Sequence, residues 1–194
     1  MFRIVVVAFF IPSVLKDTML FSYVAIILFL IAAISDWLDG HLARKYDIIS
    51  NFGKVMDPLA DKIMVLSAFL CFVQLHVVPA WIVIIIISRE FLVSGIRIMV
   101  AEEGEIIVAS NWGKAKTVIE IIAITTTLLL IAVNHTINYF GLSRQDMIIK
   151  GEPLTEFVLL TLIPYSLMLI AASVSLISGL EYFFRNKRVF DKEL

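Results

Sequence analysis

The chain has 194 residues, of which 60% are hydrophobic and 17% are charged, and its formal net charge is −1. Soluble domains are typically about half apolar and a quarter charged, so this composition, with a mean hydropathy of +0.96, excludes an ordinary soluble domain and predicts a membrane protein with several spans. The near-zero net charge gives no sign of nucleic-acid binding. The single cysteine, Cys71, excludes an intramolecular disulfide and a cysteine metal cluster.

Six segments are predicted as membrane helices, because each is apolar and long enough to cross most or all of a bilayer. In chain order they are residues 2–15, 19–45, 54–77, 80–101, 112–134 and 155–184. Pro164 is expected to kink the last helix unless neighbouring groups satisfy the carbonyl that it frees. The predicted fold class is therefore all-α, a polytopic membrane protein, with residues 1–194 forming one domain.

The positions of the basic residues predict the orientation of these helices. With an even number of spans both termini share one side, and only three of the 16 Lys and Arg residues fall on the other: Lys16, Arg144 and Lys150. Because Lys and Arg accumulate on the cytoplasmic side, both termini are expected there. The one long connection, residues 135–154, is expected on the external side.

Four aspartates stand where the second and third predicted helices meet: Asp36, Asp39, Asp57 and Asp61. The members of each pair are three or four residues apart, so each pair projects from one helix face. Residues 46–53 contain turn-forming Asn and Gly and are predicted to reverse the chain. We therefore expect the two pairs to face each other across an antiparallel helix contact on the cytoplasmic side.

This carboxylate cluster suits hard divalent cations such as Mg²⁺ or Mn²⁺, which prefer oxygen ligands. Its four members are all carboxylates, which argues against zinc. Two cations bridged by carboxylates are a known arrangement for in-line displacement at phosphorus. The alternative is ion pairing at a solvated helix end with Arg44, Lys54 and Lys62, but ionisable groups at membrane depth favour a functional site.

The motif around the aspartates reads DWLDGHLARKYDIISNFGKVMDPLAD, with a helical glycine directly after the second aspartate. It resembles the signature of the CDP-alcohol phosphatidyltransferases: Asp, two residues, Asp-Gly, two residues, Ala-Arg, eight residues, Gly, three residues, Asp, three residues, Asp. The segments SREFLVSGIR, NWGKAKT and SGLEYFFRNKRVF resemble the branch that forms phosphatidylglycerophosphate. Members of this branch usually carry an amphipathic segment and an Asn-x-x-Thr element before the arginine that corresponds to Arg3, and that segment is expected to be missing here.

The resemblance implies a six-helix enzyme that transfers a phosphatidyl group from CDP-diacylglycerol to glycerol 3-phosphate and releases CMP. Two Mg²⁺ or Mn²⁺ ions would be held around the diphosphate by Asp36, Asp39, Asp57 and Asp61. Asp61 would also be the general base for the acceptor hydroxyl. The implied contacts to the cytidine nucleotide are Gly40, Ala43, Arg44 and Gly53. The resemblance further implies a homodimer in the lipid of a bacterial cytoplasmic membrane.

Four cations in the fourth and fifth predicted helices are candidates for the acceptor's phosphate: Arg89, Arg97, Lys114 and Lys116. Cations buried in a membrane protein favour an anionic partner such as phosphate. The alternative is pairing within the chain, with Glu90, Glu102, Glu103 or Glu120. A phosphate-bearing acceptor fits glycerol 3-phosphate better than choline or ethanolamine.

Other functions remain open from the sequence. A cardiolipin synthase or an inositol-phosphate transferase of the same fold is the nearest alternative. An intramembrane prenyltransferase also uses paired aspartates, but it needs more spans and lacks the Asp-Gly-x-x-Ala-Arg segment. A divalent-cation transporter would need a polar path, which the apolar run IMVLSAFLCFV in the third helix does not offer.

Overall fold

The computed structural model describes the backbone of residues 2–16, 18–46, 51–102, 111–141, 148–149 and 152–185. Side chains are described for residues 4–16, 18–35, 62–97, 112–141 and 154–185, and for Val100. Five helices come first: α1 (Phe2–Leu15), α2 (Met19–Tyr46), α3 (Asn51–Gln74), α4 (Ala80–Glu102) and α5 (Asn111–Tyr139). A short antiparallel pair, β1 (Ile148–Ile149) and β2 (Glu152–Pro153), precedes the last helical unit, which comprises α6 (Leu154–Glu156), η2 (Phe157–Leu162) and α7 (Ile163–Arg185). All six predicted helical segments are present.

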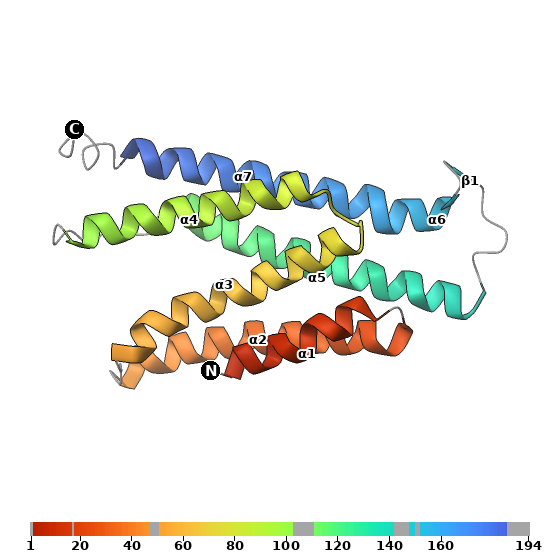
Figure 1. The fold of residues 1–194 in the computed structure, drawn as a ribbon, viewed down its shortest axis with the longest axis horizontal. Coiled ribbons are helices and arrows are strands. Elements are labelled where there is room, and N and C mark those ends of the chain that lie inside the picture. Colours follow the sequence, from red (N-terminus) through yellow and green to blue (C-terminus); the bar gives the residue numbers. More distant parts are fainter. Residues whose placement is uncertain are drawn as a thin grey trace.

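The start of α3 corrects the predicted turn between the second and third helices. Asn51 and Gly53 lie in the first turn of α3 and not in the connection. The two helices are therefore joined through residues 47–50, which lie outside the described part of the chain. Figure 1 shows α2 and α3 running in opposite directions from this connection.

The end of α3 also differs from the prediction, which continued to residue 77. His76 has a left-handed φ of 58°. Its N–H bonds to the Val73 carbonyl, and the N–H of Val77 bonds back to Phe72, both at 3.0 Å. This pattern is a Schellman motif, which ends a helix on a left-handed residue. Val77 is apolar because it is buried beside the cap and not because it continues the helix.

The segment before Pro164 shows how the chain accommodates this proline. Residues Phe157–Leu162 form a π-helical segment, and the N–H of Ile163 bonds to the carbonyl of Val158, five residues back. Proline lacks an N–H and its ring crowds the preceding turn, and a wider π turn can relieve that crowding. The disturbance that was predicted at Pro164 therefore takes the form of a change from α-helix to π-helix over the six residues of η2.

The predicted external loop of residues 135–154 is shorter than expected, because α5 continues to Tyr139. Two contacts between α5 and α2 hold this last part of the helix. His135 Nδ1 lies 2.6 Å from Ser22 Oγ, and Tyr23 Oη lies 3.1 Å from Thr136 Oγ1. Polar groups that would otherwise be exposed at the helix end are thereby paired, which favours the longer helix.

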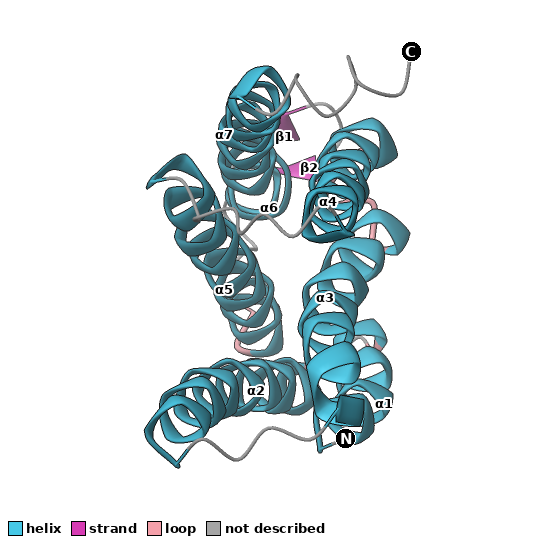
Figure 2. Ribbon diagram, turned by 90° about the vertical axis from the view of Figure 1, so that its left-hand side faces the viewer, coloured by secondary structure: helices cyan, strands magenta, loops and turns pink. Residues whose placement is uncertain are grey.

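The helices pack around α7 and α5. Helix α7 contacts α4 and α5 most extensively, α2 packs on α5, and α1 packs on α2 and α3. Figure 2 shows α2, α3, α4, α5 and α7 as a ring when the bundle is seen end-on. The core contains large apolar side chains that are at most 2% exposed, including Phe10, Phe69, Phe72, Ile82, Ile124 and Met168.

The outer surface of the bundle is apolar, as expected for contact with lipid. Large hydrophobic side chains are exposed on several helices, among them Phe9, Leu20, Phe91 and Phe184. Within the described residues, two helices have the length and apolar composition of a membrane span: Trp112–Tyr139 and Leu154–Arg185. Shorter apolar helices cover Ile4–Leu15, Met19–Ser35 and Lys62–Gln74. Exposed apolar area on this scale is unfavourable in water and suits a membrane protein.

Candidate functional site

A cavity of about 390 Å³ lies between α2, α3, α4 and α5. Most of its wall is apolar, with Phe29, Ala32 and Phe69 among the lining residues. The polar lining is concentrated in six side chains: Lys62, Glu90, Arg97, Lys116, Thr117 and Glu120. Three of these six are cations and two, Glu90 and Glu120, are carboxylates, so the cavity combines an apolar wall with a mixed charged group that has a slight excess of positive charge.

The aspartate motif borders this cavity on two helices. Ala33 lines the cavity and stands three residues before Asp36 on α2, and Lys62 lines it and directly follows Asp61 on α3. The side chains of residues 36–46 and 51–61 lie outside the described part of the chain. The predicted metal ligands and the predicted nucleotide contacts, Gly40, Ala43, Arg44 and Gly53, all fall in these two ranges. Their roles therefore remain predictions, on helices whose backbone is described.

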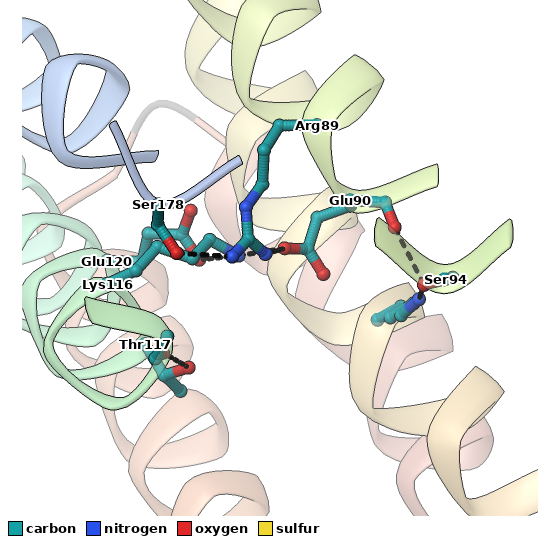
Figure 3. Close-up of polar contacts among 9 residues, drawn as sticks. Arg89, Glu90, Ser94, Lys116, Thr117, Glu120 and Ser178 are labelled. Atoms are coloured by element: carbon teal, nitrogen blue, oxygen red, sulfur yellow. Dashed lines mark hydrogen bonds and ion pairs between the residues drawn. The ribbon is translucent and has the colours of Figure 1, made fainter. Parts of the chain in front are cut away.

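Two of the predicted phosphate-binding cations pair with carboxylates of the same chain. Arg89 Nη1 donates to Glu90 Oε1 at 2.8 Å, and Lys116 Nζ donates to the same oxygen. Lys116 also forms an ion pair of 3.0 Å with Glu120 Oε2, one helical turn away. Figure 3 shows this network between α4 and α5. Of the pairings considered from the sequence, those with Glu90 and Glu120 are the ones that the structure describes.

The other two predicted cations are exposed, but they differ in position. Arg97 lines the cavity, whereas Lys114 is exposed and is not a lining residue. The side chains of Glu102 and Glu103 lie outside the described residues. The four cations predicted from the sequence thus divide into two internally paired groups, of which Lys116 is buried and Arg89 is largely covered, and two exposed ones, of which one lines the cavity.

Lys62 is a cavity cation that the sequence did not single out for the acceptor site. Its Nζ donates to Ser94 Oγ, and this hydroxyl donates to the Glu90 backbone carbonyl at 2.7 Å. The ammonium group is thereby tied to α4, next to the Glu90 network. The sequence signal that could have identified Lys62 was its position directly after Asp61. Adjacent residues of a helix project about 100° apart, so a residue beside the aspartate motif can face the neighbouring helix α4.

Arg89 is also held by a contact with α7. Its Nη2 donates to Ser178 Oγ at 2.6 Å, and Ser178 is fully buried. A Cβ on the next residue, Gly179, would lie 2.8 Å from Arg89 Cγ, so glycine gives the arginine stem its space. The buried face of α7 also includes Ala171, Ala172 and Ser175. Small residues at this spacing allow close helix contact in membranes.

Replacing Gly179 with Ala is expected to destabilise the protein by about 1–3 kcal/mol, because the added methyl forces Arg89 or α7 to move. The measurement is the midpoint of thermal unfolding in detergent. The matched control is Gly95→Ala on α4, where an added Cβ meets nothing within 4 Å. That change should leave the midpoint unchanged or raise it, since alanine favours helix by about 1 kcal/mol. Equal midpoints for the two variants would contradict the packing role of Gly179.

The chain is similar to known proteins over most of its length. Residues 1–184 match the family model described as CDP-alcohol phosphatidyltransferase. A Bacillus subtilis protein named CDP-diacylglycerol–glycerol-3-phosphate 3-phosphatidyltransferase is 52% identical over 103 residues, which cover 53% of each chain. Proteins with the same name from Rickettsia bellii and Rickettsia felis are 30% and 28% identical, over 84% and 97% of this chain and 79% and 92% of theirs. The chain thus spans about half the length of the Bacillus relative and most of the length of the two Rickettsia relatives.

Proposed function

The chain belongs to the CDP-alcohol phosphatidyltransferase family, and we propose that it transfers a phosphatidyl group from CDP-diacylglycerol to glycerol 3-phosphate. The products are phosphatidylglycerophosphate and CMP. The names of its relatives in Bacillus and Rickettsia give the same two substrates. The observation that best supports this proposal is the cavity beside the aspartate motif, lined by Lys62, Arg97 and Lys116.

The charge of the cavity favours an acceptor that carries phosphate. Arg97 is exposed to the cavity, and Lys62 and Lys116 reach it from α3 and α5. Cations form short charge-assisted hydrogen bonds with phosphate oxygens. Choline and ethanolamine are themselves cations and would be repelled. We propose Lys116 as a direct contact of the phosphate, with Arg89 behind Glu90, Lys62 and Arg97 in the lining of the same cavity, and Lys114 at the outer edge.

Two divalent ions, Mg²⁺ or Mn²⁺, are proposed to bind the four aspartates: Asp36, Asp39, Asp57 and Asp61. The backbone supports this, because α2 and α3 bring the two pairs to one end of the bundle (Figure 1). A donor set made only of carboxylates is the kind that these ions prefer. When bound, they would neutralise the diphosphate and stabilise the departing CMP.

The proposed reaction uses Asp61 to take the proton of the acceptor's primary hydroxyl. The hydroxyl oxygen forms a bond to the phosphorus that bears the diacylglycerol group. The bond from that phosphorus to the bridging oxygen breaks, and the electron pair leaves with CMP. Gly40, Ala43, Arg44 and Gly53 are proposed to hold the nucleotide, so that the leaving group stays aligned with the attacking oxygen.

The membrane arrangement is part of the proposal. We infer six spans, with both termini and the catalytic end on the cytoplasmic side of a bacterial inner membrane, and a homodimer in its lipid. The end of α2 and the start of α3, which carry the aspartates, lie at the left in Figure 1, and Lys62, which directly follows Asp61, lines the cavity. A water-soluble acceptor can reach that end from the cytoplasm, while CDP-diacylglycerol keeps its acyl chains in the bilayer.

The experiment is CMP release by the purified protein from CDP-diacylglycerol with Mg²⁺ and a panel of acceptors. Glycerol 3-phosphate is expected to support release, and a chelator is expected to abolish it. Release with phosphatidylglycerol in place of glycerol 3-phosphate would assign a cardiolipin synthase. Release only with inositol phosphate would assign the other relative considered from the sequence.

A further inference from the structure

The phosphate of an acceptor meets cations that already hold a carboxylate. Glu90 Oε1 accepts hydrogen bonds from Arg89 Nη1 at 2.8 Å and from Lys116 Nζ (Figure 3). Glu90 lines the cavity, whereas Arg89 is not one of its lining residues. The Glu90 carboxylate therefore separates Arg89 from the space that the acceptor would enter, and it occupies one hydrogen-bonding direction of Lys116.

The exposure of these side chains indicates which group can move. Arg89 and Lys116 are 10% and 5% exposed, whereas Glu90 is 28% exposed. Arg89 is fixed by Ser178 and Gly179 of α7, and Lys116 is fixed by Glu120. No comparable contact on the cavity side holds the Glu90 side chain among the described residues. Of the three partners, the carboxylate is the one that an entering anion can displace.

A displaced Glu90 side chain would remain among cations. Lys62 lines the same cavity and is tied through Ser94 to the Glu90 backbone carbonyl. Arg97 lines the cavity as well. The carboxylate can therefore exchange one cationic partner for another, which avoids the large cost of leaving a charge unpaired in a low-dielectric site.

The charge balance determines which anion can make this exchange. Two cations, Arg89 and Lys116, face two carboxylates, Glu90 and Glu120, so the closed cluster is formally neutral. A phosphate monoester carries nearly two negative charges and three free acceptor oxygens at neutral pH. A phosphodiester carries a single charge, as the carboxylate does. Only the monoester has an electrostatic advantage over Glu90 at both cations.

We propose that Glu90 is an internal competitor for the acceptor's phosphate, and that phosphate monoesters are the class of anion with enough charge to displace it from Arg89 and Lys116. The proposal rests on the function proposed above. It would explain in physical terms how a cavity with an apolar wall rejects a lipid acceptor such as phosphatidylglycerol, whose phosphate is a diester. Competition of this kind reduces the apparent affinity by the fraction of sites that are open.

The test is calorimetric binding of methyl phosphate and of dimethyl phosphate to the purified protein, which does not depend on turnover. The unchanged protein should bind methyl phosphate at least about tenfold more tightly than dimethyl phosphate. Glu90→Gln keeps the side-chain length and removes the charge. It should tighten the binding of both ligands, because the competitor is removed for both, and lower the KM for glycerol 3-phosphate by about threefold or more. Glu156→Gln on α6, at the far end of the bundle, is the charge-matched control. It should change neither the binding of the two ligands nor the KM for glycerol 3-phosphate.

Two results would overturn the proposal: equal binding of the two ligands by the unchanged protein, or binding of methyl phosphate by Glu90→Gln that is no tighter than by the unchanged protein. If Glu90→Gln does not fold, Glu90→Asp retracts the carboxylate by one methylene, weakens the competitor and should also tighten the binding of both ligands. CMP release is recorded in parallel. Loss of the binding preference with normal turnover contradicts this inference alone, whereas binding as expected without turnover contradicts the proposed reaction.

Discussion

Replacing Asp61 with Asn is expected to lower CMP release by at least about 100-fold while the protein remains folded. The proposed base must remove a proton from an alcohol, and an amide of the same shape cannot do so. The change also removes one charged metal ligand, so the effect combines both roles. The measurement is the initial rate of CMP release at saturating substrates, with the thermal unfolding midpoint as the test of folding.

The control for this experiment is Asp146→Asn, which removes the same charge from the connection between α5 and β1. That variant is expected to keep its rate. Raising the Mg²⁺ concentration should not restore Asp61→Asn if the lost proton acceptor is responsible. A rate within about threefold of the unchanged protein would remove Asp61 from the role of base.

Replacing Lys116 with Met is expected to have the second largest effect, on both stability and acceptor use. The Lys116 side chain is 5% exposed and pairs with Glu90 and Glu120. Its loss leaves Glu120 without the cation that balances it, at a cost of about 3 kcal/mol or more in the free energy of unfolding. The KM for glycerol 3-phosphate should rise on the order of tenfold, because a direct phosphate contact is lost. The KM for CDP-diacylglycerol should change much less.

Lys114→Met is the matched comparison, since it changes the same residue type two positions away on α5. Lys114 is exposed, so its removal uncovers no buried carboxylate. Its effect on the unfolding free energy should stay within about 0.5 kcal/mol, as is usual for surface substitutions. Equal effects of the two variants on stability would show that the Lys116 ion pairs contribute nothing. A larger rise in the acceptor KM for Lys114→Met would move the phosphate site to the outer edge.

Much of the fold could be predicted, because each helix corresponds to a long apolar run in the sequence. The ends of the helices were harder to predict from the sequence. The left-handed conformation of His76 depends on how Val77 packs, and the π turn depends on how the chain meets Pro164. The final turns of α5 depend on a hydrogen bond between His135 and Ser22, which are 113 positions apart. Such contacts are set by the tertiary structure and leave no local pattern.

The site was predictable to a similar degree. The spacing of the four aspartates indicated the family, and the match over residues 1–184 confirms it. The cations of α4 and α5 were also visible, but the sequence could not show which of them face the cavity. Arg89 lies behind Glu90 and against Ser178, whereas Lys62 and Arg97 line the cavity. That distinction depends on how four helices are rotated about their axes, which residue spacing within one helix does not determine.

The central claim, phosphatidyl transfer to a hydroxyl of glycerol 3-phosphate, is tested most directly by following the attacking oxygen. Purified protein is supplied with CDP-diacylglycerol, Mg²⁺ and glycerol 3-phosphate that carries a heavy-oxygen label in its primary hydroxyl. The molecular masses of the lipid and nucleotide products are then measured by mass spectrometry. The proposed reaction predicts phosphatidylglycerophosphate that retains the label and an equal amount of unlabelled CMP. Labelled CMP, or CMP formed without any labelled lipid, would contradict it.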